Sequence, residues 1–397
     1  MDFADFLRDM LGITKDFAIT KVNKDEDEKI IRIHLHYLNR NFKGYKIYDY
    51  APEREWQHLN WFDYRCYIVC SLPRYLADDG KPKTIDINFA PKFKGYTHLF
   101  AAHIIEALQK VKVQSTVADL FHTTPYIVRS IMEDAVERGL AQRSEINDLE
   151  YVSLDEKAYT QGHKYATILI DSQKNYVVEM IEGRKEKNVK ALFFSLNSQE
   201  RQASIKRVNM DMWKPYMNAV SEIAPNAIIV HDKFHLFKKL SEAIDKTRRK
   251  EVKENELLKG HKYTVLKNQE NRTEKQQNDF EQMLNDNLLT AQAWQIRENF
   301  KYLFQVTEDI ETHYQLWKED AISKAIKAVN DVVATFDRHI KGIYNAITTK
   351  TSSAKHENTN GKIQAVIAKA RGFRNFDRFR INMLFHFGNL NLLPLRI

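Results

Sequence analysis

The sequence predicts an α/β (α+β) protein: a mixed β-sheet flanked by helices and interrupted by an all-helical insertion. Between residues 146 and 235, short β-branched segments alternate with turns and helical stretches in the order β-β-β, helix, β, helix, β. This order is typical of a mixed sheet covered by helices. From residue 236 to about residue 350 the chain is lysine-rich, poor in strand-like segments and periodic in the way of helices. The last helical segment is expected to return the chain to the sheet.

The composition is that of a globular protein large enough for two or three domains. The chain has 397 residues, of which 43% are hydrophobic. A formal net charge of +8 is compatible with a polyanionic partner, although it is also common in proteins without one. The N-terminus has no cationic signal region, and no apolar run is long enough to span a membrane. We therefore expect a soluble, cytoplasmic protein with no membrane partner.

The only two cysteines are Cys66 and Cys70. Two cysteines make no disulfide framework, and a single C-x-x-x-C pair is weak evidence for zinc. A reducing compartment fits this composition.

Changes in pattern along the chain predict five parts. They are a small N-terminal domain (1–90), a helix-turn-helix region (91–145), the first part of a catalytic core (146–235), an all-helical insertion (236–350) and the C-terminal helical part of the core (351–397).

The second part contains the sequence "QSTVADLFHTTPYIVRSIMEDAVERGL", which predicts two helices joined by a tight turn. Thr123 or Thr124 is expected to cap the second helix, with Pro125 at its first position. A DNA-binding helix-turn-helix has this form, and residues 124–136 would then read DNA. A packing hairpin without DNA contacts fits the same pattern.

Acidic residues follow two of the predicted strands. Asp155 ends "YVSLD" and Asp211 ends "VNMD". Carboxylates at neighbouring strand ends meet at one edge of a sheet, and Mg²⁺ prefers such oxygen ligands. Asp211 could instead cap the next helix and Asp155 could be a turn residue. Asp232, which ends "IIVHD", competes with Asp211, whereas Asp171 is expected to form a turn.

A third acid, Glu357, lies in a helical stretch otherwise rich in lysine and amides, "SSAKHENTNGKIQAVIAKA". Helical periodicity places it on one stripe with Asn360 and Gln364. A second stripe is apolar and comprises Ile363, Val366, Ile367 and Ala370, and a third comprises Lys355, Lys362 and Lys369. Without further context, the better explanation of Glu357 is a first-turn acid favoured by the helix dipole.

Three blocks together resemble the ISL3 family of bacterial insertion-sequence transposases, a branch of the DDE transposases with an RNase H-like catalytic fold. These blocks are "SLDEKAY" followed by "GHKYATILID", "VNMDMWKPY" followed by "APNAIIVHDKFHLFKKL", and "HENTNGKIQAVIAKARGFRNFDRFR". The resemblance runs from about Tyr45 to the end of the chain. It implies that Asp155, Asp211 and Glu357 are the catalytic, metal-binding acids, and that Asp232 lies near the metal site but outside it.

The resemblance also implies the chemistry. Two Mg²⁺ or Mn²⁺ ions, both contacted by Asp155, would support strand cleavage at transposon ends and joining to target DNA. The resemblance implies two kinds of partner. One is double-stranded DNA, which comprises the transposon ends with their terminal inverted repeats and the target DNA. The other is a second copy of the chain, with which it would form a homodimer. The residues expected to contact DNA are Thr124, Tyr126, Arg129, Lys362, Lys369, Arg371 and Arg374.

The N-terminal part departs from the family pattern. Family members commonly carry paired cysteines in a zinc-binding module, but "YLNRNFKGYKIYDY" has no cysteine where the first pair is expected. Cys66 and Cys70 remain as a remnant, with His58 nearby in sequence, and we predict that no zinc is bound. Two other functions share these features: a catalytically inactive or domesticated DNA-binding protein derived from a transposase, and a metal-dependent DNA nuclease that cuts without joining.

Overall fold

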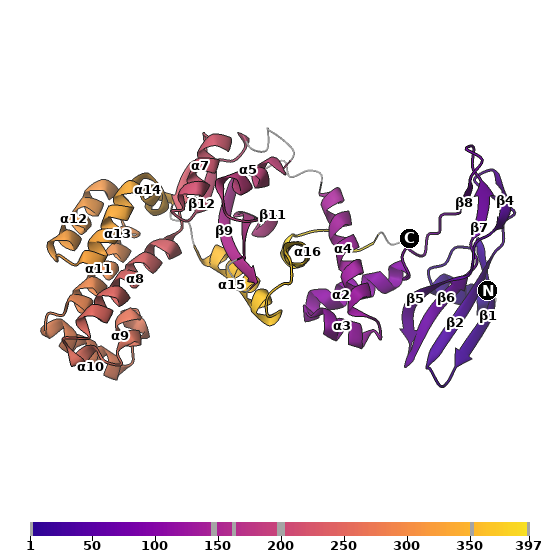
Figure 1. The fold of residues 1–397 in the computed structure, drawn as a ribbon, viewed down its shortest axis with the longest axis horizontal. Helices are drawn as coiled ribbons and strands as arrows, with labels where there is room; N and C mark the ends of the chain where they lie inside the picture. Colours follow the sequence, from indigo (N-terminus) through magenta and orange to yellow (C-terminus); the bar gives the residue numbers. More distant parts are fainter. Residues whose placement is uncertain (1–2, 144–148, 161–163, 197–202, 350–352, 395–397) are drawn as a thin grey trace. The chain divides into compact units, whose positions relative to one another are not determined.

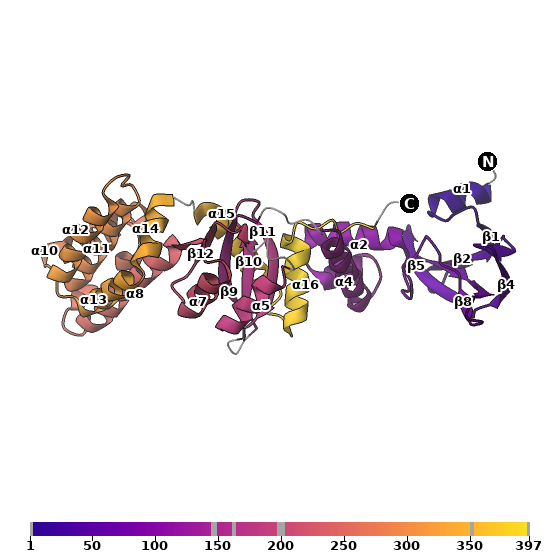
Figure 2. The ribbon, with the colours of Figure 1, turned by 90° about the horizontal axis from the view of Figure 1, so that it is seen from above.

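The computed structural model describes residues 3–143, 149–160, 164–196, 203–349 and 353–394, with the backbone alone for 353–358 and 360. It confirms a mixed α/β protein with three sheets (Figures 1 and 2). Contacts divide the chain into two units, Met1–Ser144 with Ile381–Ile397, and Glu145–Arg380. The five-part division stays a prediction, and the grouping of residues 381–397 with the N-terminal unit is a boundary that the sequence does not predict.

The N-terminal unit begins with helix α1 and two small sheets. One sheet has the strand order β1-β2-β6-β5 and the other β3-β4-β7-β8. The elements are α1 (Phe3–Met10), β1 (Phe17–Asp25), β2 (Ile30–Tyr37), β3 (Asn41–Phe42), β4 (Tyr45–Tyr50), β5 (Arg54–Trp61), β6 (Tyr64–Cys70), β7 (Pro73–Leu76) and β8 (Pro82–Thr84). Strand β2 buries Ile31, Ile33 and Leu35 because alternate side chains of a strand face the same side.

The two cysteines lie in the core of this first sheet. Cys66 and Cys70 are buried on β6, and burial raises the pKa of each thiol to about 12. Both sulfurs are therefore neutral thiols packed among apolar side chains. His58 is also buried, with Nδ1 2.8 Å from the hydroxyl of Thr97. The prediction that no zinc is bound stays a prediction.

Three helices follow: α2 (His98–Val111), α3 (Gln114–Leu120) and α4 (Pro125–Gln142). Thr124 caps α4, since its hydroxyl accepts a hydrogen bond of 3.2 Å from the amide of Ile127, and Pro125 is the first helical residue. Val117 of α3 and Val128 of α4 are fully buried. The predicted helix pair and its cap are confirmed, whereas DNA reading stays a prediction.

The second unit is built on a five-stranded sheet in the order β11-β10-β9-β12-β13. Strands β9, β10 and β11 are antiparallel, while β12 is parallel to both β9 and β13. The elements are β9 (Tyr151–Thr160), β10 (Lys164–Asp171), β11 (Tyr176–Glu182), α5 (Glu186–Phe194), β12 (Arg207–Met210), α7 (Lys214–Ile223) and β13 (Ile228–His231). Helices α5 and α7 pack on this sheet through an apolar core that includes Leu154, Val208, Phe193 and Val220.

After β13 the described chain is helical. The helices are α8 (Lys233–Glu251), α9 (Lys262–Leu266), α10 (Glu274–Asn285), α11 (Leu289–Leu303), α12 (Ile310–Ser323), α13 (Lys327–Arg338) and α14 (Ile340–Thr349), with short 3₁₀ turns at Glu256–Leu258 and Gln269–Asn271. Aromatic residues pack within their largely aliphatic core, with Phe300 against Trp317 and Phe336. Helix α14 contacts the sheet again, since the side-chain amide of Asn345 donates a hydrogen bond of 2.8 Å to the backbone carbonyl of Ile229.

The last helices of the described residues are α15 (Ser353–Lys369) and α16 (Phe376–Phe387). The apolar stripe of α15 is confirmed for Ile363, Val366 and Ile367, which are buried. It is wrong for Ala370, which is exposed because the helix ends one residue earlier. The hydroxyl of Thr359 donates a hydrogen bond of 2.6 Å to the side chain of Asn175, which fixes α15 to the turn between β10 and β11. None of the described helices combines the length and apolar character needed to cross a membrane.

Candidate active site

Asp155 lies in the middle of β9, not at its end as the sequence suggested. Strand β9 continues because it still pairs with β10, while its parallel pairing with β12 stops at Ser153. Asp155 therefore lies just past the edge where β12 ends. Its neighbour Leu154 packs into the core under α5 and α7, so alternation turns Asp155 to the opposite face. One carboxylate oxygen of Asp155 forms an ion pair with the Nζ atom of Lys157, at a distance of 2.7 Å.

Asp211 immediately follows β12, as predicted. It does not cap α7, because the cap position is Trp213, which makes no side-chain capping bond. One carboxylate oxygen of Asp211 accepts a hydrogen bond of 2.7 Å from the amide of Met212. The other lies 3.4 Å from Nδ1 of His235, in the first turn of α8. Asp211 thus has no role in ending or starting a helix.

Asp232 follows β13 and has such a role. It is the N-cap of α8, and its carboxylate accepts a hydrogen bond of 2.9 Å from the amide of Phe234. A capping carboxylate also interacts favourably with the helix dipole. The structure therefore gives Asp232, but not Asp211, a structural function. Asp171 forms a turn as expected, since one of its oxygens accepts from the amides of Gln173 and Lys174.

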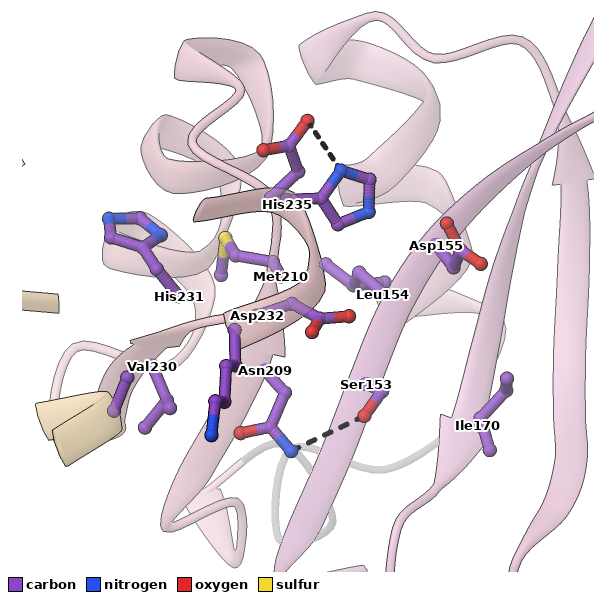
Figure 3. A pocket seen from close by; sticks show the side chains of 13 residues that line it. Ser153, Leu154, Asp155, Ile170, Asn209, Met210, Val230, His231, Asp232 and His235 are labelled. Atoms are coloured by element: carbon purple, nitrogen blue, oxygen red, sulfur yellow. Dashed lines mark hydrogen bonds and ion pairs between the residues drawn. The ribbon is translucent and has the colours of Figure 1, made fainter. Parts of the chain in front are cut away.

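Asp155, Asp211 and Asp232 line one cavity, which we call the acidic cleft. Figure 3 shows Asp155, Asp232 and His235 around its inner part. The outer part is a cavity of about 500 Å³. Its lining residues are Leu154, Asp155, Glu156, Lys157, Arg184, Asp211, Trp213, Tyr216, Asp232, Phe234, His235, Lys238, Gly361 and Gln364. Separate segments of the chain, including α15, thus contribute to one site.

Glu357 falls on α15, but its side chain lies outside the described residues. The same helix reaches the cleft at Gly361 and Gln364. Positions 357, 361 and 364 share one helical stripe because they are spaced by four and three residues. Among described side chains, no group of three or more histidine, cysteine or acidic residues is arranged to hold a metal.

The donor set of the cleft fits a hard divalent cation. Asp155 and Asp211 offer carboxylate oxygens at the same cavity, and Mg²⁺ is bound in proteins by one or two carboxylates together with water or phosphate oxygens. Asp155 is mostly buried with 15% of its side chain exposed, while Asp211 is more open at 39%. Both carboxylates therefore reach a space that solvent also enters.

Several residues of the cleft were not singled out from the sequence. Lys157 could have been found, because residues two apart on a strand face the same side and it follows Asp155 at that spacing. His235, Arg184 and the exposed Trp213 and Phe234 come to the cleft through tertiary structure. No local pattern marks them as site residues.

The basic residues expected to contact DNA lie at the surface. Lys362, Lys369, Arg371 and Arg374 are all exposed. In the N-terminal unit, Tyr126 is 67% exposed at the start of α4, and the guanidinium of Arg129 stacks 5.2 Å from its ring. An exposed aromatic beside a cation at a helix start is compatible with DNA contact.

Known proteins similar to this chain are transposases. A family model for ISL3-type DDE transposases, described as "Transposase", matches residues 152–383. The transposase for insertion sequence element IS1001 of Bordetella parapertussis is 26% identical over 335 residues, covering 80% of each chain. The transposase for insertion sequence element IS1557 of Mycobacterium tuberculosis is 24% identical over 412 residues, covering 93% of this chain and 92% of that one.

Proposed function

This chain belongs to the ISL3 family of DDE transposases, and on that premise we propose that it binds the terminal inverted repeats of an insertion sequence, cleaves DNA strands there and joins them to target DNA. The observation that carries the proposal is the convergence of Asp155 and Asp211 on one cleft with α15. These two aspartates come from β9 and from the end of β12, so only the fold brings them together.

We assign Asp155, Asp211 and Glu357 as the acids that hold the metal ions. Asp155 and Asp211 are supported by their place in the cleft and by the absence of a capping role for Asp211. Glu357 is supported by the stripe it shares with Gly361 and Gln364. Two Mg²⁺ or Mn²⁺ ions held there would supply activation of a water or DNA 3′-hydroxyl and stabilisation of the leaving oxygen.

Two other residues of the cleft orient these acids. Lys157 holds the Asp155 carboxylate at 2.7 Å, and His235 approaches that of Asp211 at 3.4 Å. Fixed side chains lower the cost of reaching the productive geometry. Asp232 stays the alternative second acid, because it also lines the cleft.

DNA would be held by exposed cationic and polar residues outside the cleft. We assign phosphate contacts to Lys362, Lys369, Arg371 and Arg374, which lie on or just after α15. We assign recognition of the ends to the helix-turn-helix formed by α3 and α4, with Thr124, Tyr126 and Arg129 at the start of the second helix. A homodimer would pair two ends, and we expect it in the cytoplasm, at the nucleoid when DNA is bound.

The strand order of the five-stranded sheet supports the proposal of an RNase H-like catalytic core. Three antiparallel strands are followed by two that are parallel to the first of them, and the helices α8–α14 come between β13 and α15. This order fits a catalytic core whose last acid follows a helical insertion, as the family resemblance implies.

The test is a cleavage and joining assay with a DNA fragment containing the cognate element end, target plasmid and Mg²⁺ or Mn²⁺. Wild-type protein should give both nicked ends and joined products. Asp155→Asn, Asp211→Asn and Glu357→Gln should each lower cleavage by at least about a hundredfold, because a lost metal ligand removes several kcal/mol of transition-state stabilisation. DNA binding should persist in all three.

Each other outcome points to a different function or assignment. Cleavage without joining would identify a nuclease, and end binding without cleavage in any metal would identify an inactive DNA-binding descendant. If Asp232→Asn abolishes cleavage and Asp211→Asn does not, Asp232 is the second metal-binding acid in place of Asp211. If Glu357→Gln cleaves as well as wild type, Glu357 is not the third metal-binding acid.

A further inference from the structure

We propose that Trp213, Phe234 and Arg184 form a stacking site for an unpaired nucleobase of the DNA strand that is being processed at the acidic cleft. This inference rests on the proposed function, because it takes DNA as the substrate. It adds a base-binding site to the phosphodiester chemistry of the carboxylates.

Each of two strand ends carries an acid and then, two residues later, an exposed aromatic side chain. Asp211 is followed by Trp213, and Asp232 is followed by Phe234. Trp213 is 43% exposed and Phe234 is 54% exposed, and both line the cavity of about 500 Å³. Large aromatic side chains gain free energy when they are covered, so two of them open to one cavity indicate a ligand surface.

Trp213 is held in place although it is exposed. Its indole N–H donates a hydrogen bond of 3.2 Å to the carbonyl of Arg184. The guanidinium of Arg184 lies 5.3 Å from the Trp213 ring and 4.2 Å from the Tyr165 ring. An ion pair of 3.0 Å with Glu156 fixes the guanidinium further. The indole is thus oriented before any ligand arrives, which lowers the entropic cost of stacking.

Phe234 is tied to the same site through the backbone. Its amide donates a hydrogen bond of 2.9 Å to the Asp232 carboxylate, and its ring lies 5.7 Å from the ring of His235. The position of the Phe234 side chain is therefore coupled to the first turn of α8. Both aromatic walls belong to the elements that place the acids.

The chemistry of the cavity favours a base over other occupants. Every nucleobase has a flat π-face that stacks on aromatic rings and guanidinium planes, and this contact tolerates any sequence. Lys157, Arg184 and Lys238 also line the cavity and supply positive charge for the flanking phosphates. Two aromatic side chains among charged residues make a small, polar-rimmed surface, which suits a nucleotide.

Inside a duplex both faces of a base are covered by its stacked neighbours, so the occupant is a base that has left the stack and is unpaired. A base held beside Asp155 and Asp211 would fix the position of the neighbouring phosphodiester. DNA that is already unpaired next to the cleavage position should consequently bind more tightly than fully paired DNA.

The test measures binding of two DNAs of arbitrary sequence: a short duplex, and the same duplex with a single-stranded 3′ extension that contains the fluorescent base 2-aminopurine. Ca²⁺ replaces Mg²⁺, since its larger and looser coordination still neutralises the carboxylates. Wild-type protein should prefer the extended DNA by about tenfold and quench 2-aminopurine, because stacking on an aromatic ring contributes that much per base.

The variants separate stacking from general binding. Trp213→Ala and Phe234→Ala should each reduce the preference and the quenching but keep the affinity for the plain duplex, whereas Trp213→Phe should retain most of both. The matched control is Tyr302→Ala, which removes a 63% exposed aromatic of α11 outside the cleft and should change neither.

The outcomes also separate this inference from the proposed function. If wild-type protein binds both DNAs equally, or if Trp213→Ala keeps the full preference, the stacking site is wrong while DNA binding stands. If Trp213→Ala alters self-association and leaves DNA binding unchanged, the aromatic wall is a protein interface and the inference is again wrong. If wild-type protein binds neither DNA, both the inference and the proposed function fail.

Discussion

Nδ1 of His235 lies 3.4 Å from a carboxylate oxygen of Asp211. This contact joins the first turn of α8 to the end of β12, two elements separated by α7 and β13. The other oxygen of Asp211 accepts a bond from its neighbouring amide. Both carboxylate oxygens of Asp211 thus have a partner that limits the rotation of the side chain. One of these partners, His235, belongs to α8, the first helix after β13.

We predict that His235→Ala lowers the rate of strand cleavage by about tenfold at saturating DNA, because the Asp211 carboxylate loses an orienting partner. His235→Asn should restore most of the rate, since its amide nitrogen can take the place of Nδ1, whereas His235→Gln should not. Cleavage rates and DNA affinity are measured for each variant, and the affinity should stay constant.

The control for this prediction is a second histidine–aspartate contact in the same unit. Nδ1 of His261 lies 3.6 Å from Asp279, far along the chain from the cleft residues. His261→Ala should leave the cleavage rate unchanged. Equal losses in His235→Asn and His235→Ala would contradict an orienting role of Nδ1.

Asp232 and Asp211 should differ in their effect on stability. Asp232→Ala removes the cap of α8 and should lower the free energy of unfolding by about 1 kcal/mol. Asp211→Ala removes no cap and should cost less. Chemical denaturation of both variants beside wild type tests this through the shift of the unfolding midpoint, and a larger loss for Asp211→Ala would show that Asp211 is the structural acid.

Stability should fall on acidification because of buried histidines such as His58. Desolvation lowers the pKa of His58 from 6.5 to about 4, with the nearby His103 as a lesser cause. The unfolded chain therefore takes up a proton at higher pH than the folded protein does. The stability that depends on neutral His58 is complete above about pH 6.5 and is lost as the pH falls toward about 4.

The variant His58→Asn should reduce the slope of unfolding free energy against pH in this window by up to one proton. Burial also lowers the pKa values of His231 and His386 to about 4. These two histidines should therefore account for the pH dependence of the unfolding free energy that remains in the variant. Denaturant titrations at several pH values measure it. A slope unchanged from wild type would exclude His58 as a contributor, and the exposed His313→Asn serves as control.

The contact between α14 and β13 should not tolerate a larger residue at Gly342. A Cβ atom there would lie 2.4 Å from the ring of His231. Gly342→Ala should lower the unfolding free energy by about 1–3 kcal/mol through overpacking. Gly361→Ala, where nothing lies within 4 Å of the added atom, should be neutral or stabilising in its helix. Thermal unfolding of both variants tests the contrast, which would vanish if α14 could shift freely.

Exposed arginines after α15 should contribute to DNA binding through phosphate contacts. Arg374→Ala should weaken binding to any duplex and reduce the slope of log affinity against log salt by about one. Lys259→Ala, at a 79% exposed position among the insertion helices, should leave the slope unchanged. Fluorescence anisotropy over a salt series gives both slopes, and equal slopes for Arg374→Ala and wild type would remove the assigned contact.

Much of the architecture could be predicted from local patterns. The strands around Ile33 and Ile68 follow from alternating apolar residues, and the start of α4 follows from Thr124 and Pro125. The buried stripe of α15 follows from helical periodicity, except at Ala370, where the helix has ended. These features depend on interactions between residues close in sequence.

The position of Asp155 within β9 could not be predicted in the same way. The strand continues past the acid because β10 pairs with it along the whole length, and that pairing is a contact between segments. Likewise, only the structure distinguishes Asp232, which caps α8, from Asp211, which caps nothing. A carboxylate near a strand end has the same sequence signal in either case.

Local sequence patterns predict the mixed α/β class, the helical character of the segment after β13, and the acids that could hold metal. The shared cleft of Asp155, Asp211 and α15, with Lys157, His235, Arg184 and Trp213 around it, follows only from the packing of the elements. The reason is physical. Local hydrogen bonding and apolar periodicity specify helices and strands one at a time, whereas a site is made by side chains from elements that meet only when the sheet and its covering helices are packed.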